Sequence, residues 1–269
     1  MPTGNRELMS TPSQLLSVLV PVYNEAKTVE TVLRQVLALG AIVKEVVVVD
    51  DGSTDGTAAI LDRVAAEDSR IRVFRLDRNR GKTAAVRRAL AQATGDVLII
   101  QDADLEYDPA EIPNVVAPIL EGKADVVYGS RFLVRRATRV LYFHHYMANC
   151  CLTFLSNLLT NRNMSDIETC YKAFRSGVIR PLGLTSRGFG LEVEITAMIC
   201  KTNARTYEVP ISYYGRTYDE GKKIVLGDAV RALMYILYYN LVAPHSAAVR
   251  AYVRRVNAYL ESIHSAEYE

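Results

Sequence analysis

The sequence predicts an α/β fold with a mostly parallel β-sheet flanked by helices on both faces. Three features of the first 130 residues support this prediction. Short apolar runs alternate with longer amphipathic stretches, which is typical of strands that alternate with helices. The runs are rich in Val and Ile without polar alternation, as in residues 46–49, and such runs suit strands that are covered on both faces. Successive repeats of this kind indicate crossover connections between parallel strands.

The predicted elements follow in order from Leu15 onward. Apolar runs predict strands over residues 16–20, 45–49, 71–76, 97–100 and 125–128. Amphipathic stretches between them predict helices over residues 26–39, 57–66, 83–93 and 110–120. Residues 1–14 are polar and lack apolar periodicity, so we expect a flexible lead-in. We expect a main domain over residues 15–230, and an amphipathic helical segment over residues 231–269.

The overall charge and the cysteines exclude some classes of function. Lys and Arg number 32 and Asp and Glu number 30, which gives a formal net charge of +2. This balance gives no global electrostatic basis for binding nucleic acid. The four cysteines form no Cys-x-x-Cys pair, which fits reduced thiols in a cytosolic protein better than a disulfide framework or a zinc site.

Two acidic clusters stand directly after predicted strands. Asp50-Asp51-Gly52-Ser53 follows the second strand, and Asp102-Ala103-Asp104 follows the fourth. Open α/β sheets bind ligands in the crevice at the carboxyl edge of their strands, so both clusters are candidate ligand sites. We expect one nucleotide and one metal there. No Gly-x-Gly-x-x-Gly turn follows the first strand, which argues against a dinucleotide-binding dehydrogenase.

The order of these motifs resembles the family 2 glycosyltransferases with the GT-A fold. The matching segments are Val20-Pro21-Val22-Tyr23-Asn24-Glu25, Val49-Asp50-Asp51-Gly52-Ser53-Thr54-Asp55-Gly56-Thr57, Asp102-Ala103-Asp104, Tyr128-Gly129-Ser130-Arg131 and Arg216-Thr217-Tyr218-Asp219-Glu220-Gly221-Lys222. Within that family the chain looks most like the dolichyl-phosphate mannose synthase and bacterial polyprenyl-phosphate glycosyltransferase branch. The resemblance implies a nucleotide-sugar-binding half over residues 15–130 and an acceptor half over residues 131–230.

The resemblance also implies the reaction, an inverting and metal-dependent transfer of a sugar from a GDP-mannose or UDP-hexose type of donor. The diphosphate that leaves carries negative charge, and Mg²⁺ or Mn²⁺ neutralises it through hard oxygen ligands. By this resemblance Asp104 is the main metal ligand, and Asp102 contacts the sugar or ribose and shares the metal. Ala103 lies against the nucleotide. The alternative for the two acids is capping of the following helix.

Further donor contacts are implied by the same resemblance. Pro21, Tyr23 and Glu25 are expected to form a wall around the base. Val49 and Asp51 are expected beside the nucleoside, where Asp51 is suited to accept hydrogen bonds, or instead to cap a helix. Lys82, which opens the helix after the third strand, is expected among the donor-binding residues, and the cations expected to contact the phosphates are Arg131, Arg216 and Lys222.

The acceptor is predicted from an uncharged stretch between Arg139 and Arg162. Its apolar and polar residues separate onto two faces, which predicts an amphipathic helix over residues 140–160. With Arg135, Arg136 and Arg139 at its start, this helix is typical of one that lies in a membrane interface. Packing on the sheet or in a homodimer interface is the alternative. We therefore expect a peripheral enzyme on the cytoplasmic face of the membrane.

The segment from Asp166 to Lys172 resembles the acceptor-side motif of the same branch, so the resemblance implies a polyprenyl or dolichyl phosphate acceptor. A phosphate monoester is already ionised and needs no general base, whereas a sugar hydroxyl needs one. Asp166 is expected either to be that base or to hold Arg131 or Lys172. Two other functions stay open: transfer to a saccharide or other soluble hydroxyl acceptor, and nucleotidyl transfer. Nucleotidyltransferases usually carry a glycine-rich basic loop where residues 23–27 stand here.

Overall fold

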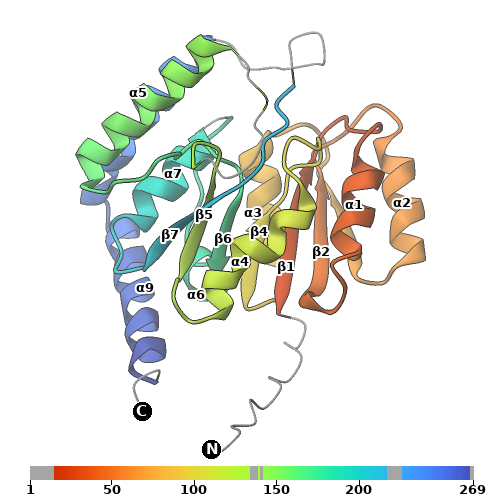
Figure 1. The fold of residues 1–269 in the computed structure, drawn as a ribbon, viewed down its shortest axis with the longest axis horizontal. Helices are drawn as coiled ribbons and strands as arrows, with labels where there is room; N and C mark the ends of the chain where they lie inside the picture. The colour runs from red at the N-terminus through yellow and green to blue at the C-terminus, as the bar shows by residue number, and fades with distance from the viewer. Residues whose placement is uncertain (1–14, 134–138, 140–141, 189, 217–225, 267–269) are drawn as a thin grey trace, which may run out of the picture.

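A computed structural model describes residues 15–133, 139, 142–188, 190–216 and 226–266 of the chain. The predicted lead-in, Arg135, Arg136 and Lys222 lie outside the described residues. The described part forms a sheet with helices on both faces (Figure 1).

The sheet has seven strands in the order β3-β2-β1-β4-β6-β5-β7. The strands are β1 (Leu16–Val22), β2 (Val43–Asp50), β3 (Ile71–Arg75), β4 (Val97–Ile100), β5 (Val126–Ser130), β6 (Lys172–Arg175) and β7 (Thr206–Pro210). β1 pairs in parallel with β2 and β4, β2 with β3, and β5 with β7. Only β6 runs antiparallel, between β4 and β5. The predicted α/β fold with a mostly parallel sheet is confirmed.

The helices follow the predicted alternation through residue 120. The α-helices are α1 (Val29–Leu37), α2 (Thr57–Glu67), α3 (Lys82–Gln92), α4 (Ile112–Leu120), α5 (Phe143–Thr160), α6 (Ser176–Ile179), α7 (Gly190–Ile199), α8 (Leu226–Leu237) and α9 (Ala247–Ala266). Short 3-10 helices are η1 (Gly40–Ile42), η2 (Pro109–Glu111) and η4 (Ala243–His245), and η3 (Tyr238–Val242) is a π-helix.

The first helix begins three residues later than predicted because the residues before it are used elsewhere. The backbone N–H groups of Asn24, Glu25 and Ala26 donate to side chains of the loop after β2. These bonds fix the end of β1 against that loop, so the segment is held in a non-helical conformation.

Two cores lie on opposite faces of the sheet, because successive residues of a strand point to opposite faces. Val46 and Val48 pack with α1, α2 and α4 on one face, whereas Val47 and Val49 pack with α3 and α7 on the other. Side chains of α8 and α9 join the second core. Residue 230, where we expect the main domain to end, lies inside α8, and side chains of α9 pack into the second core.

Candidate functional site

A cavity of about 1190 Å³ opens at the carboxyl edge of β1, β2 and β4. Most of the donor-site residues predicted from the sequence line it: Pro21, Tyr23, Glu25, Asp51, Lys82, Asp102, Ala103, Asp104, Arg131 and Arg216. Val49 does not line the cavity, because this strand residue points into the core and is fully buried. Lys222 lies outside the described residues.

The loops after β2 and β3 are packed closely together beside the cavity. Asp50 accepts a hydrogen bond from the Ser53 backbone at 2.9 Å and so closes the turn after β2. Gly52 has a φ of +74°, and a Cβ there would lie 2.6 Å from the Arg78 carbonyl carbon. Glycine is required at this position both for its backbone conformation and for the space that the second loop occupies.

Asp51 holds the loop that follows β3. Its two carboxylate oxygens accept hydrogen bonds from the backbone N–H groups of Arg80 at 2.8 Å and Gly81 at 2.7 Å. Burial raises the pKa of Asp51 above its usual value in spite of these bonds. Each carboxylate oxygen can accept a second bond, so the expected contact with a nucleoside stays a prediction.

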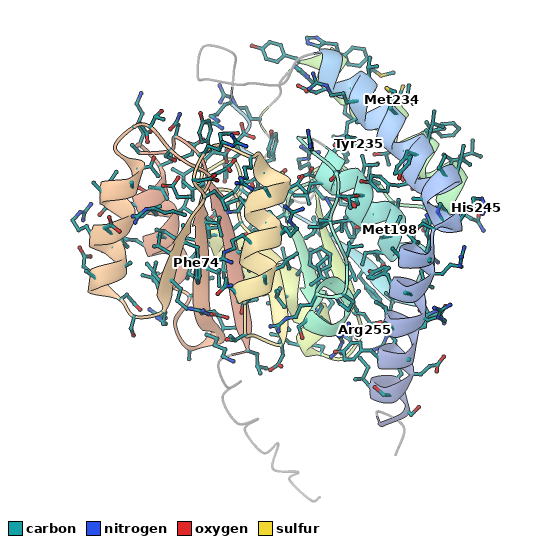
Figure 2. The ribbon with its side chains drawn as sticks, turned by 180° about the vertical axis from the view of Figure 1, so that it is seen from behind. Phe74, Met198, Met234, Tyr235, His245 and Arg255 are labelled. Carbon is teal, nitrogen blue, oxygen red and sulfur yellow. The ribbon has the colours of Figure 1, made fainter. Side chains whose placement is uncertain are left out.

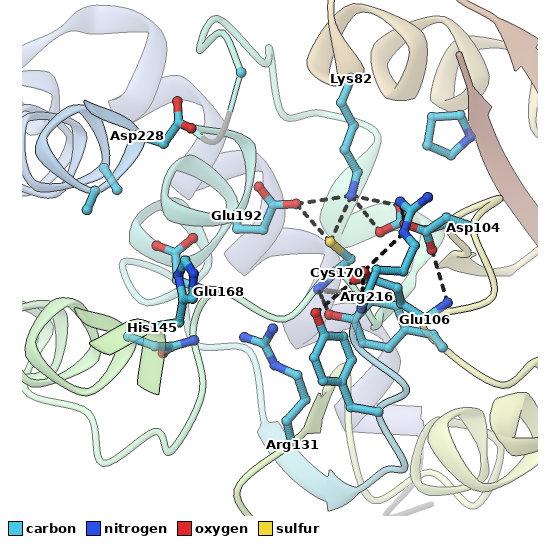
Figure 3. Close-up of a pocket in the computed structure, with 18 of the residues that line it drawn as sticks. Lys82, Asp104, Glu106, Arg131, His145, Glu168, Cys170, Glu192, Arg216 and Asp228 are labelled. Atoms are coloured by element: carbon cyan, nitrogen blue, oxygen red, sulfur yellow. Dashed lines mark hydrogen bonds and ion pairs between the residues drawn. The ribbon is translucent and has the colours of Figure 1, made fainter. Parts of the chain in front are cut away.

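Lys82 lies at the centre of a polar network inside the cavity (Figure 3). Its Nζ is 2.7 Å from Asp102 Oδ1, 2.8 Å from Cys170 Sγ and 3.3 Å from Glu192 Oε1. Burial alone would raise the pKa of Asp102, but the charge and hydrogen bond of Lys82, the hydrogen bond from Cys170 and the charge of Lys172 together hold that pKa below the usual value. Asp102 is therefore ionised and paired with a cation at neutral pH.

Asp104 faces a mixture of charges. Its Oδ2 is 2.7 Å from Arg216 Nη2, and Arg216 Nε is also 3.3 Å from Glu106 Oε1. Burial, together with the carboxylates of Asp102 and Glu106, raises the pKa of Asp104 to about 7. A cation at this position would relieve the repulsion among these acids.

These residues fit a hard divalent cation. The described residues contain no group of three or more His, Cys, Asp or Glu side chains arranged as a metal cage. Asp102 and Asp104 could instead supply one or two carboxylate ligands, which is the usual protein contribution to a Mg²⁺ that also binds substrate phosphates. The hard oxygen donors and the raised pKa of Asp104 agree with such a site.

Arg131 reaches the cavity from the end of β5 and is fixed from behind by Asp166. The Nε and Nη2 atoms of Arg131 donate to the two Asp166 oxygens at 2.7 and 2.8 Å. Asp166 is 0% exposed, and burial would raise its pKa, but Arg131 outweighs burial and keeps the pKa below its usual value. Asp166 does not contribute to the cavity wall, so this geometry fits its role as a holder of Arg131.

Glu106, Glu168 and Tyr213 also line the cavity, and no sequence motif assigns them a role. Glu106, two residues after Asp104, accepts a hydrogen bond from the Tyr213 hydroxyl at 2.8 Å. Glu168 lines the cavity, and its buried Oε1 has no hydrogen-bond partner among the described residues. Burial and the nearby Glu192 carboxylate raise the pKa of Glu168 to about 8. The only sequence signal for either residue was an acid beside a recognised motif.

Helix α5 covers the other end of the cavity, with polar residues buried and apolar residues exposed to solvent. Its polar residues Thr153 and Ser156 are buried at 5% and 2% exposure, whereas Phe143, Phe154 and Leu158 are 72%, 69% and 67% exposed. Residues at its beginning, including His144, His145 and Asn149, line the cavity. Its apolar face therefore does not pack on the protein's own sheet.

Helix α8 packs against α5 and extends the exposed apolar surface. Exposed side chains on α8 and η3 are Val230, Leu233, Met234, Leu237, Tyr238, Leu241 and Val242, and Met234 is labelled in Figure 2. We call the exposed apolar side chains of α5, α8 and η3 the apolar platform. In the described part of the chain, every helix is too short or too polar to cross a bilayer.

A mostly parallel sheet with this acidic and basic cavity at its carboxyl edge defines a protein of the GT-A class. The profile of glycosyl transferase family 2 matches residues 17–183, and the chain belongs to that family. The predicted family is therefore confirmed.

Several curated relatives are similar to the chain over part of their length. Glycosyltransferase AglD of Haloferax volcanii is 38% identical over 141 residues, which cover 50% of this chain and 23% of that protein. The undecaprenyl-phosphate 4-deoxy-4-formamido-L-arabinose transferase of Edwardsiella ictaluri is 32% identical over 214 residues, which cover 78% of this chain and 63% of that protein. The chain thus spans less than two thirds of the length of these relatives.

A solved structure supports the fold. Glucosyl-3-phosphoglycerate synthase from Mycobacterium tuberculosis, in complex with Mn²⁺, UDP and phosphoglyceric acid, superimposes with a TM-score of 0.66 at 21% identity. The match covers 85% of this chain and 79% of that one.

Proposed function

We propose that this chain is an inverting, metal-dependent glycosyltransferase that moves a sugar from a nucleotide-diphosphate sugar to a polyprenyl phosphate. The observation that carries this proposal is one cavity that joins two different ends. Asp102, Asp104 and Arg216 lie at the sheet edge, and α5, with its exposed apolar face, covers the opposite end. A water-soluble donor and a lipid-bound acceptor would meet between them.

The donor end offers groups that suit a nucleoside diphosphate. Asp102 and Asp104 would hold Mg²⁺ or Mn²⁺, which when bound supplies positive charge that stabilises the leaving diphosphate. Arg216 is 2.7 Å from Asp104, and Lys82 is 2.7 Å from Asp102. Both cations would add positive charge beside the leaving diphosphate. Tyr23 and Glu25 line the cavity where the base is expected. The solved neighbour was also crystallised with UDP-glucose. For this chain the proposed donor is a UDP- or GDP-sugar.

The acceptor end offers a fixed cation. Arg131 is held in place by Asp166 through two hydrogen bonds, which suits it to orient a phosphate monoester. An oxygen of that phosphate would attack the anomeric carbon, and the bond from that carbon to the diphosphate would break with inversion. The attacking oxygen is already ionised, so no carboxylate has to act as a base.

The apolar platform is proposed to lie on the cytoplasmic face of the membrane. Exposed Phe, Leu, Tyr and Met side chains over two packed helices suit burial at the boundary between headgroups and acyl chains. The relative from Edwardsiella ictaluri, whose match covers 78% of this chain, is named for undecaprenyl phosphate, a lipid. A lipid anchored there could present its phosphate to the cavity at the beginning of α5.

The proposal is tested by following the products of purified protein with a panel of GDP- and UDP-sugars. Each donor is offered with Mn²⁺ and either polyprenyl phosphate in detergent or a soluble saccharide. The expected result is release of nucleoside diphosphate with one donor, together with a glycolipid product. A soluble glycoside as the main product would contradict the lipid acceptor, and release of pyrophosphate would indicate nucleotidyl transfer instead.

A further inference from the structure

A second, basic cleft of about 600 Å³ lies on the other side of the loop that Asp51 holds. Its walls come from the loop after β3, the first turns of α3 and the loop before α7. The cleft shares Asn79 and Gly81 with the donor cavity, whereas its charged residues and Thr83 line the cleft and not the cavity. The proposed glycosyl transfer uses none of these residues.

The charge of the cleft comes from four arginines, Arg78, Arg80, Arg87 and Arg187. Arg80 is paired with Asp77 at 2.8 Å. Within the described part of the chain, the other three make no ion pair with a carboxylate, and Arg87 Nη1 donates only to the Leu184 carbonyl at 3.2 Å. Among the described residues, the cleft therefore keeps positive charge that is not neutralised by an ion pair.

One carboxylate lies under the wall of the cleft. Glu194 is buried, and it accepts hydrogen bonds from the backbone N–H groups of Thr185 and Ser186, each at 2.8 Å. These bonds fix the loop before α7 in place. Glu194 does not itself line the cleft, so the arginines determine the charge that a ligand meets.

Two buried hydroxyl groups of residues that line the cleft have no hydrogen-bond partner among the described residues. They are Thr83 Oγ1, in the first turn of α3, and Ser186 Oγ, in the loop before α7. The two residues are only 3% and 6% exposed. A buried hydroxyl without a partner destabilises the folded state, so folded proteins seldom leave one unless water or a ligand supplies the missing hydrogen bond.

The start of α3 adds a further attraction for negative charge. This helix has 11 residues, and Gly81 at its N-cap supplies no side chain to cap it. The N-terminus of a helix favours anions through its free N–H groups and its dipole. Arginine forks, hydroxyl donors and a helix N-terminus form a set that suits the oxygens of a phosphate.

We propose that this basic cleft binds a phosphate group, separately from the diphosphate of the donor. The phosphate could belong to a soluble phosphate compound or to the headgroup of an anionic lipid. The second source is within reach, because the backbone N–H of Arg187 donates to the Tyr235 hydroxyl of α8, the helix that carries part of the apolar platform.

The test measures binding of inorganic phosphate to the full chain by calorimetry, in EDTA so that no metal bridges phosphate to the donor cavity. All variants are made in an Arg216→Ala background, which weakens phosphate binding at the donor end. Arg87→Ala is expected to lower the affinity about tenfold. The matched control is Arg88→Ala, because Arg88 is the next residue on α3 but its guanidinium lies 5.4 Å from the Phe74 ring, outside the cleft.

A second variant guards against a purely structural effect. Thr83→Val removes the unpartnered hydroxyl and keeps the shape, so it should raise the melting temperature without phosphate and reduce the shift that phosphate produces. A structural role alone would leave the phosphate-induced shift unchanged.

Vesicles distinguish the two sources of the phosphate. Sedimentation is compared for phosphatidylcholine vesicles with and without phosphatidylglycerol. Loss of phosphate binding in Arg87→Ala supports a soluble ligand, and loss only of the extra binding to phosphatidylglycerol supports a lipid headgroup. If Arg87→Ala behaves like Arg88→Ala in both measurements, the proposed site does not exist.

Discussion

At the scale of single residues, Asp104 is a cavity acid whose pKa is raised to about 7 by burial and by neighbouring carboxylates. It is half-buried beside two other carboxylates, and Arg216 neutralises it only in part, since that arginine also contacts Glu106. An amide at this position keeps the shape and removes the charge. The Asp104→Asn variant should therefore separate folding from cation binding.

We expect Asp104→Asn to lose at least ~100-fold in metal-dependent transfer while unfolding at the same temperature or higher. The rise in melting temperature on adding Mn²⁺ with a nucleoside diphosphate should shrink in parallel. Asp62→Asn, at an exposed position of α2, is the control. Full activity with an unchanged Mn²⁺ shift would contradict the metal role of Asp104.

Glu168 provides a prediction about pH. Its folded-state pKa is raised from 4.5 to about 8, so the folded protein favours the protonated form. A raised carboxyl pKa contributes stability that is complete below the unfolded pKa and is lost as the pH rises through the folded value. Between pH 6 and 9 the wild type should lose on the order of 2 kcal/mol relative to Glu168→Gln.

Urea unfolding of both proteins at pH 6 and pH 9 measures this difference. Glu261→Gln, on the exposed side of α9, controls for the loss of one carboxyl group. Parallel stability curves for wild type and Glu168→Gln would show that Glu168 is ionised without penalty.

A site residue could be predicted from sequence where its motif also determined where its side chain points. Asp51, Asp102 and Asp104 follow strands directly, so the end of each strand places them at the sheet edge. Val49 is in the same motif but two residues before Asp51, still inside β2, where its side chain packs into the core. The raised pKa of Glu168 comes from burial by segments far apart in the chain, which sequence alone does not show.

At the scale of elements, the strands that were missed lack the signal that identified the others. β6 has only four residues and begins and ends with charge, as Lys172-Ala-Phe-Arg175, and β7 is a partly exposed edge strand. Neither contains a run of Val and Ile. Helix α5 was predicted from its two-faced pattern, but that pattern does not say which face turns to water. Contacts of Thr153 and Asn149 with the acceptor-side loop decide it.

The outward face of α5 leads to a prediction about membrane binding. Replacing Phe154 and Leu158 together by Gln removes two exposed apolar side chains and buries no new polar group, so folding should be maintained. Sedimentation with phosphatidylcholine vesicles should fall several-fold, while the melting temperature stays the same or rises.

The same variant distinguishes a membrane from a second copy of the chain. If the platform is a homodimer interface, size-exclusion chromatography without detergent should show a dimer that the double Gln variant turns into a monomer. Vesicle binding that is absent in the wild type would contradict a membrane role for the platform.

At the scale of the whole molecule, a buried acid joins the end of the chain to the sheet. Asp125 is 0% exposed and lies just before β5. It contacts Arg175 at 3.1 Å, Arg205 at 3.3 Å and His264 of α9 at 3.0 Å. Three strands and the last helix therefore meet at one carboxylate.

Asp125→Asn should destabilise the protein by roughly 3 kcal/mol, because it leaves Arg175 and Arg205 without the carboxylate that they share. The loss is measured as the free energy of unfolding in urea, with Asp62→Asn as the control. Asp125 does not line the donor cavity, so binding of nucleotide at low temperature should be kept. A variant as stable as the wild type would mean that the cations gain little from this carboxylate.

The overall fold was predictable up to β5 because strand and helix alternate there in sequence and in space. In the sheet, β4 pairs with β1 and not with β3, and β5 is separated from β4 by β6. β6 returns from the acceptor-side loop and inserts between β4 and β5 in the opposite direction. Such a pairing is determined by contacts between residues far apart in the chain, so the local sequence pattern does not predict it.

The loop of residues 79–81 separates the donor cavity from the basic cleft, and its backbone also binds Asp51. A ligand that shifts this partition from one side changes the affinity on the other side by a factor that thermodynamics requires to be equal in both directions. The affinity for the donor would then vary with the concentration of the phosphate compound that binds in the basic cleft.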